Sequence, residues 1–288
     1  MKKYTSKHER KNSIPNKTYS GHVCSNNASC CIVGKDLYGI KAQNDGYVVL
    51  YKITNYVNTN ASITYYPIKY SNGKYLQCHH ANSITNTAGT GFIIATMNDT
   101  DKPAAIKISK TGVVKKEIYH ISSSGENKSL SCITFVRQVN GKNQFIVGDG
   151  RCNNSDDSFS PKYKLATLYS NKLIDEPYTY YTNIHLSNDL TANDITYDEN
   201  AKAFYNVYFK KNSKNQIATN YVHKFPISNL EITQELIAQK QWTCKKTSKE
   251  TKFEIEAFFL GGDKGSTKYC ITNTEGDGID GLYKLVNE

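Results

Sequence analysis

Proline, arginine and long apolar runs are scarce in this chain of 288 residues. Six prolines, without a Gly-X-Y period, exclude a collagen-like or proline-rich fibre. The longest apolar runs, such as residues 93–95 and 257–260, fall far short of the roughly 18 residues that span a bilayer, so we expect no membrane partner. Arg10, Arg137 and Arg151 are the only arginines, too few for the bidentate base contacts of sequence-specific DNA recognition.

Cysteine is also sparse, with eight residues and no pair at the C-x-x-C spacing. This usage argues against a disulfide scaffold or a structural zinc site and predicts reduced, buried thiols. Residues 1–7 are basic but have no apolar stretch behind them, so we expect no secretory leader and a cytoplasmic protein. We also expect a monomer.

Positive charge is in surplus. Lys and Arg number 36 against 26 Asp and Glu, a formal net charge of +10. Six of the basic residues precede residue 18, where Glu9 is the only acid, so we predict a flexible basic tail over residues 1–17 and one folded domain over residues 18–288. The other lysines are scattered and would attract anionic ligands at long range.

The chain repeats one pattern five times: a small or polar residue, an apolar run, a turn, and a second strand-like run. The pairs of runs are 29–33 with 36–40, 82–85 with 91–95, 131–135 with 144–148, 193–197 with 203–207, and 255–259 with 268–271. A third run follows each pair, and two of these, 106–108 and 283–285, alternate apolar and polar residues as half-buried strands do. Repetition at this period is typical of stacked or radial β architectures.

The repeat spacing predicts the fold class. The equivalent positions Ile32, Ile84, Ile133, Ile195 and Ala257 are 52, 49, 62 and 62 residues apart, about one four-stranded blade each. We therefore predict an all-β chain forming a single five-bladed β-propeller of four-stranded antiparallel blades. The last repeat has room for only three strands, so an N-terminal strand, expected near residues 18–23, would close the ring. A β-sandwich or a two-domain β protein is the alternative.

In a propeller, the first strand of each blade lines the central channel, so residues at the strand starts converge on one axis. The predicted ligand-binding residues are His80, Asn82, Ser131, Asn193, Asp194, Glu254 and Glu256, with Arg151 reaching over one face from a Gly-rich turn. Strand alternation places His80 on the face of Asn82, which favours it over His79. A purely structural role is the alternative, because Asn and Asp at such positions often bond neighbouring backbone.

These residues suggest three functions. The first is binding of a small polar or anionic ligand, a nucleotide or a sugar, in the central channel. The second is a metal-dependent hydrolase of phosphorylated small molecules, with Ca²⁺ or Mg²⁺ held by the oxygen-bearing side chains of Asn82, Asn193, Asp194 and Glu256. The third is a protein-interaction scaffold.

The repeats resemble the five-bladed β-propeller superfamily, which includes calcium-dependent apyrases, several glycoside hydrolase families and a sugar-binding lectin. The strand starts 80–83 (His-Ala-Asn-Ser) and 191–194 (Thr-Ala-Asn-Asp) are similar to those of propellers from Gram-positive bacteria. The resemblance implies polar or acidic strand starts around a shared site. The chain differs from the glycosidases, whose first three blades carry acidic residues at the strand starts, because residues 30–31, 82–83 and 132 of this chain are not acidic.

Overall fold

The computed structural model describes residues 1–43, 45–78, 80–88, 90–98, 101–148, 161–185, 190–262, 265–276 and 278–287. Every regular element in these ranges is a β-strand, so the predicted all-β class is confirmed. Within them, no helix exists that could cross a membrane.

Most strands fall into five sets of four antiparallel neighbours, which we call blades 1 to 5. Blade 1 is β4 (Asn26–Val33), β5 (Asp36–Ala42), β6 (Val48–Ile53) and β7 (Ile63–Pro67). Blade 2 is β8 (Ser83–Asn86), β9 (Phe92–Ala95), β10 (Ala105–Ile108) and β11 (Val114–Ile121). Blade 3 is β13 (Cys132–Val139), β14 (Lys142–Gly148), β15 (Lys162–Tyr169) and β16 (Lys172–Thr182).

Blade 4 is β17 (Leu190–Asp198), β18 (Ala203–Lys211), β19 (Ile217–Pro226) and β21 (Lys240–Lys245). Blade 5 is β22 (Glu250–Gly261), β23 (Thr267–Gly276), β24 (Gly281–Asn287) and, from the other end of the chain, β1 (Lys2–Ser13). The short strands are β2 (Lys17–Tyr19), β3 (His22–Cys24), β12 (Asn127–Lys128) and β20 (Gln234–Leu236).

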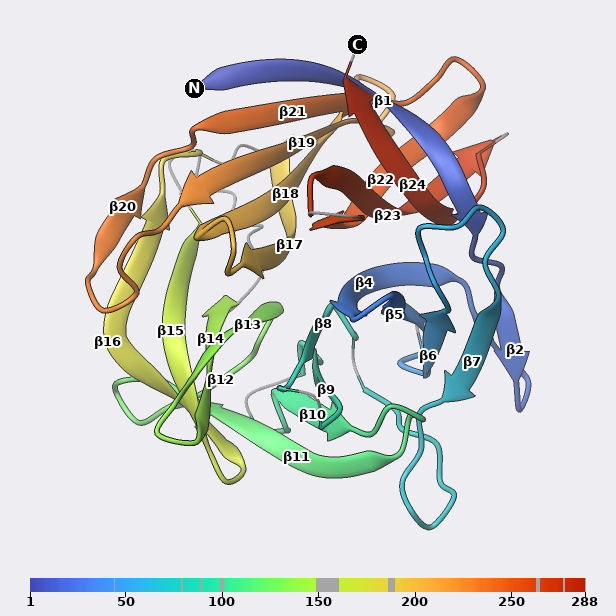
Figure 1. Cartoon of the computed structure of the whole chain (residues 1–288). Helices are drawn as coiled ribbons and strands as arrows, with labels where there is room; N and C mark the ends of the chain where they lie inside the picture. The colour runs from blue at the N-terminus through green and yellow to red at the C-terminus, as the bar shows by residue number, and fades with distance from the viewer. Residues whose placement is uncertain are drawn as a thin grey trace.

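The blades surround one axis (Figure 1). Their first strands, β4, β8, β13, β17 and β22, which we call the inner strands, contact one another in that order, and β22 contacts β4 again. Two pairs of outer strands also join in parallel, β11 with β16 and β1 with β21. This pairing covers outer edges that would otherwise expose unpaired backbone groups.

The predicted flexible tail is wrong. Lys2–Ser13 forms β1, which pairs antiparallel with β24 and parallel with β21, while residues 18–23, the expected closing strand, lie in the hairpin β2–β3. Buried and exposed side chains alternate in part of this charged segment. Ser6 and the His8 side chain are buried, and the His8 ring stacks on Phe253 with 3.9 Å between ring centroids. Alternation of buried and exposed residues makes a strand, not a tail.

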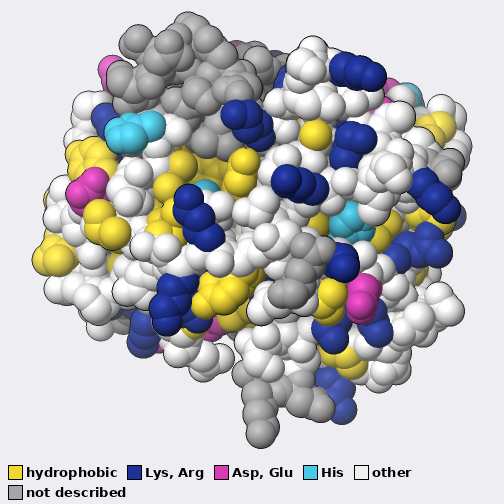
Figure 2. Space-filling model, turned by 90° about the horizontal axis from the view of Figure 1, so that it is seen from above, with side chains coloured by type: hydrophobic (Ala, Val, Ile, Leu, Met, Phe, Trp, Pro, Cys, Tyr) yellow, Lys and Arg dark blue, Asp and Glu magenta, His cyan; other side chains and the backbone are white. Residues whose placement is uncertain are grey.

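Two lysines of β1 border a surface groove that β1 forms with β21. The groove has a volume of about 660 Å³, and its lining includes Lys3, Lys7, Lys245 and Lys246. Figure 2, which looks down on the side that carries β1 and β21 in Figure 1, shows many Lys and Arg side chains and few acidic ones. Part of the positive charge therefore lies on this side of the molecule, at the groove between β1 and β21.

Candidate ligand-binding site at the hub

One end of the inner strands encloses a cavity of about 370 Å³. Six of the predicted site residues line it: His80, Asn82, Ser131, Asn193, Glu254 and Glu256. They come from blades 2 to 5, so residues up to 176 positions apart in sequence meet here, as the ring geometry requires. The cavity is open to solvent beside the exposed side chains of Asn26 and His80.

The inner-strand starts are positioned by backbone hydrogen bonds that extend the ladders of blades 2 and 3. The His80 amide donates to Thr96 O and the Asn82 amide donates to Ala95 O, both at 3.0 Å. The Ser131 amide donates to Gly148 O at 2.9 Å. These residues are thus held on rigid sheet, which fixes the direction of their side chains toward the axis.

A carboxyl pair forms one wall. Lys252, Glu254 and Glu256 alternate along β22 and all line the cavity. The Lys252 ammonium lies 2.8 Å from Glu254 Oε2, and Glu256 accepts hydrogen bonds from Asn193 Nδ2 at 3.0 Å and Asn273 Nδ2 at 2.6 Å. Burial, and then the neighbouring charge of Glu254, raises the pKa of Glu256 well above its usual range. Glu256 therefore holds a proton more readily than an exposed carboxyl group does.

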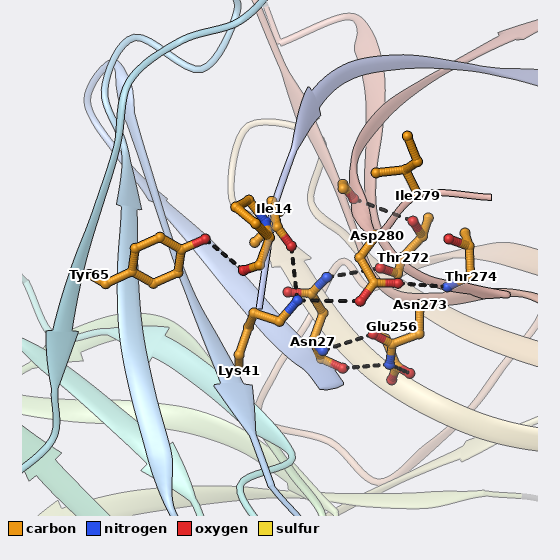
Figure 3. Close-up of polar contacts among 12 residues, drawn as sticks. Ile14, Asn27, Lys41, Tyr65, Glu256, Thr272, Asn273, Thr274, Ile279 and Asp280 are labelled. Carbon is orange, nitrogen blue, oxygen red and sulfur yellow. Dashed lines mark hydrogen bonds and ion pairs between the residues drawn. The ribbon is translucent and has the colours of Figure 1, made fainter. Parts of the chain in front are cut away.

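The adjoining wall, on blade 1, carries a buried side-chain oxygen to which no described group donates. Asn27 and Asn273 bond each other through two 2.8 Å contacts with backbone, and Asn27 Nδ2 donates to Thr272 O at 2.9 Å (Figure 3). Asn27 Oδ1 is buried, yet no described group donates to it. Buried polar atoms nearly always have a partner, so this oxygen is an exception among the described groups of the cavity wall.

Asp194 does not line the cavity, which corrects its assignment as a ligand. It is 3% exposed and lies deeper along the axis, where Ser29 Oγ and Ser83 Oγ both donate to its carboxylate, Ser83 at 2.9 Å. The Ile195 amide also donates to it, at 2.8 Å. Burial raises the pKa of Asp194 to about 7, against these hydrogen bonds, which lower it. The carboxyl thus joins blades 1, 2 and 4.

Hydroxyl groups join the remaining blades farther along the inner strands. Thr85 Oγ1 accepts from the Phe135 amide at 2.8 Å, Thr134 Oγ1 from the Tyr197 amide at 3.1 Å, and Thr196 Oγ1 donates to Phe258 O at 2.8 Å. The structural alternative weighed from the sequence therefore holds for the middle of the axis. At the cavity end the polar side chains instead surround open space.

A lysine latch joins blade 1 to blade 5 and to the end of β1. Lys41 is fully buried, and its ammonium donates to Ile14 O at 2.9 Å and to Asp280 Oδ2 at 3.3 Å (Figure 3). Asp280 Oδ1 in turn accepts from the Thr274 amide at 2.8 Å. Burial lowers the pKa of Lys41, and Asp280 opposes that effect. This contact fixes the position of the segment that follows β1.

Among the described residues, no group of three or more His, Cys, Asp or Glu side chains lies together as a metal site would need. Of the predicted ligands, Asp194 is bonded elsewhere, and the Lys252 ammonium beside Glu254 would repel a cation. Arg151 lies outside the described residues.

Sequence reasoning missed Lys252, Asn273 and Phe209, which also line the cavity. Lys252 could have been found, because it shares a strand face with Glu254 and Glu256 at period two. Asn273 and Phe209 come from the second strands β23 and β18, and only the ring packing brings them to the axis.

Comparison with known proteins finds structures of similar fold but no family for this chain. No family model and no curated protein sequence matches the chain. A member of the DUF4221 family from Bacteroides vulgatus is similar in structure, with a TM-score of 0.51 at 9% identity over 98% of each chain. An exo-β-1,3-galactanase from Phanerochaete chrysosporium has a TM-score of 0.49 at 11% identity, over 97% of this chain and 64% of its own.

The catalytic domain of the Coprinopsis cinerea GH62 α-L-arabinofuranosidase has a TM-score of 0.49 at 9% identity, over 99% of this chain and 96% of its own. At such identities the likeness is one of fold alone. The chain therefore shares an all-β architecture with the DUF4221 protein over nearly its whole length.

Proposed function

We propose that the chain is a single five-bladed β-propeller, its ring closed by β1, whose hub cavity binds a small neutral polyhydroxyl ligand such as a sugar. The observation that carries this proposal is the meeting of polar side chains from four blades, Asn82, Ser131, Asn193 and Glu254, around a cavity of about 370 Å³. That volume is at the lower end of the roughly 300–1,000 Å³ of small-molecule sites.

The lining selects for hydroxyl groups. The Glu254 carboxylate can accept hydrogen bonds, and so can Asn193 Oδ1, because the Asn193 Nδ2 group already donates to Ile255 O and Glu256 Oε2. The amide of Asn82 can both donate and accept. A hydroxyl is both donor and acceptor and suits such a mixed surface. Phe209 adds an apolar surface on which the C–H face of a sugar ring can pack.

Local charge argues against the anionic ligand considered from the sequence. Two glutamates line the hub cavity and Lys252 is paired with one of them. The lysine-lined groove lies instead on the rim between β1 and β21. A nucleotide phosphate in the hub would face Glu254 at close range, so a neutral ligand is favoured.

The carboxyl pair favours binding over glycoside hydrolysis. Glycosidases hold two carboxyls roughly 5–9.5 Å apart, with the scissile bond between them. Glu254 and Glu256 lie on one strand face, and both oxygens of Glu256 already accept hydrogen bonds from Asn193 and Asn273, so the two carboxyls do not face each other across open space. This arrangement supports a binder that releases its ligand unchanged.

The test is a thermal-shift and calorimetric panel of neutral mono- and disaccharides, with ADP, inorganic phosphate and Ca²⁺ as the charged arms. A ligand at 100 times its Kd adds about 2.7 kcal/mol to the stability of the state that binds it. We expect a neutral sugar to raise the Tm and be recovered intact, and the charged probes to have no effect.

Asn82→Ala and Glu254→Gln should each weaken that binding at least tenfold, whereas Glu235→Gln, an exposed carboxylate change on β20, should leave it unchanged. If no sugar in the panel raises the Tm or gives a binding signal, the proposal is contradicted and the interaction scaffold is favoured. Turnover that a chelator abolishes would favour the metal-dependent hydrolase instead.

A further inference from the structure

A second cavity, of about 300 Å³, lies at the opposite end of the inner strands. On β17, Asn193 lines the first cavity, whereas residues 196–198 line the second. On β22, Glu256 lines the first cavity and Phe259 lines the second. The layer of Ser29, Ser83 and Asp194 lies between these positions on the inner strands. The two cavities are therefore separate compartments.

The second cavity differs from the first in character. Its floor is apolar and aromatic, with Ile84, Phe135 and Phe259 among the lining residues. Its rim carries Asp198 and Glu199. In a chain of net charge +10, none of its described lining residues is Lys or Arg. This combination is complementary to an organic cation, because aromatic faces and carboxylates both attract positive charge.

Hydrogen-bonding capacity points the same way. Asn86, a lining residue, has a buried side-chain oxygen with no donor among the described groups. Asp198 Oδ1 accepts from the amides of Asn200 and Ala201 at 2.9 and 3.1 Å, which leaves its second oxygen for another donor. Glu199 pairs with Lys202, and both of these side chains are more than half exposed, so their pairing is screened by solvent. An ammonium group supplies several donors and no acceptor.

We infer that this second cavity binds a small organic amine, with an apolar or aromatic body on the floor and its ammonium toward Asn86 and the Asp198–Glu199 rim. The site is independent of the sugar-type ligand proposed for the first cavity. Neither ligand needs the other to bind, because the buried layer around Asp194 separates them.

The experiment compares three matched probes by NMR titration of the whole chain: 2-phenylethylammonium, its neutral isostere 2-phenylethanol, and the anion phenylacetate. We expect saturable binding of the cation with a Kd in the millimolar range typical of fragments, at least fivefold weaker binding of the alcohol, and none of the anion. Equal binding of the cation and the alcohol overturns the proposal.

Variants localise the site. Asn86→Leu and Glu199→Gln should each weaken binding of the cation at least threefold, whereas Asn82→Ala, in the first cavity, should leave it unchanged. Because Glu199 is exposed, its variant keeps the test valid should Asn86→Leu fail to fold. Binding of the cation that survives Glu199→Gln and any folded Asn86 variant, or that Asn82→Ala abolishes, contradicts the assignment.

Discussion

The buried carboxyl of Asp194 makes a pH-dependent prediction about stability. Its pKa is raised from the usual 3.8 to about 7, chiefly by burial. Between these values the folded state holds a proton that the unfolded chain has lost, so stability falls as pH rises from about 4 through about 7. At about 1.4 kcal/mol for each pH unit, the total loss is about 4 kcal/mol.

Asp194→Asn removes this dependence while keeping the shape of the side chain. At pH 4 we expect the variant to be about 1 kcal/mol less stable than the parent, because one amide N–H lacks a partner. At pH 8 it should be about 3 kcal/mol more stable, since the parent then carries a buried charge. The stability difference between variant and parent should therefore change sign between these pH values.

The assay is urea unfolding at pH 4 to 8, followed by the fluorescence of Trp242, the chain's single tryptophan, which is 7% exposed. Asp36→Asn is the matched control. Burial raises the pKa of Asp36, but its hydrogen bond with Lys52 outweighs that and leaves the pKa lowered. The pH dependence of its contribution therefore lies at and below about pH 4, and the stability difference between Asp36→Asn and the parent should stay nearly constant from pH 4 to 8. A stability difference for Asp194→Asn that stays constant across this range would refute the reasoning.

Three further predictions concern the ring. Lys41→Met removes the donor to Ile14 O and the pair with the partly exposed Asp280, and should cost about 2–4 kcal/mol in urea unfolding; an unchanged midpoint would contradict the latch. Burial lowers the pKa of His223 from 6.5 to about 4, so stability declines as pH falls through this window, and His223→Gln should recover about 3 kcal/mol at pH 4 relative to pH 7; a parallel pH profile would argue against it. Deleting residues 1–13 should lower the Tm by more than 10 °C, and a synthetic peptide of this sequence should restore it; a folded truncated chain with the parent's Tm would show that β1 does not close the ring.

Much of the architecture followed from the residues alone. The five repeats and their turns correspond to the first three strands of each blade, because alternation at period two and the turn residues between runs are local properties. Of the predicted site, His80, Asn82, Ser131, Asn193, Glu254 and Glu256 do meet in one cavity, since the start of each inner strand must face the axis once the repeats form a ring.

Tertiary packing decided the rest. Whether a polar strand residue faces open space or a neighbouring blade depends on its depth along the axis, and adjacent positions such as Asn193 and Asp194 differ in this respect. The role of residues 2–13 was likewise not local: their charge is typical of a solvated tail, and only pairing with β24 and β21, from the far end of the chain, makes them a strand. Local patterns determine which segments are strands and which residues are polar, whereas the contacts between distant blades determine which of those residues remain open to a ligand.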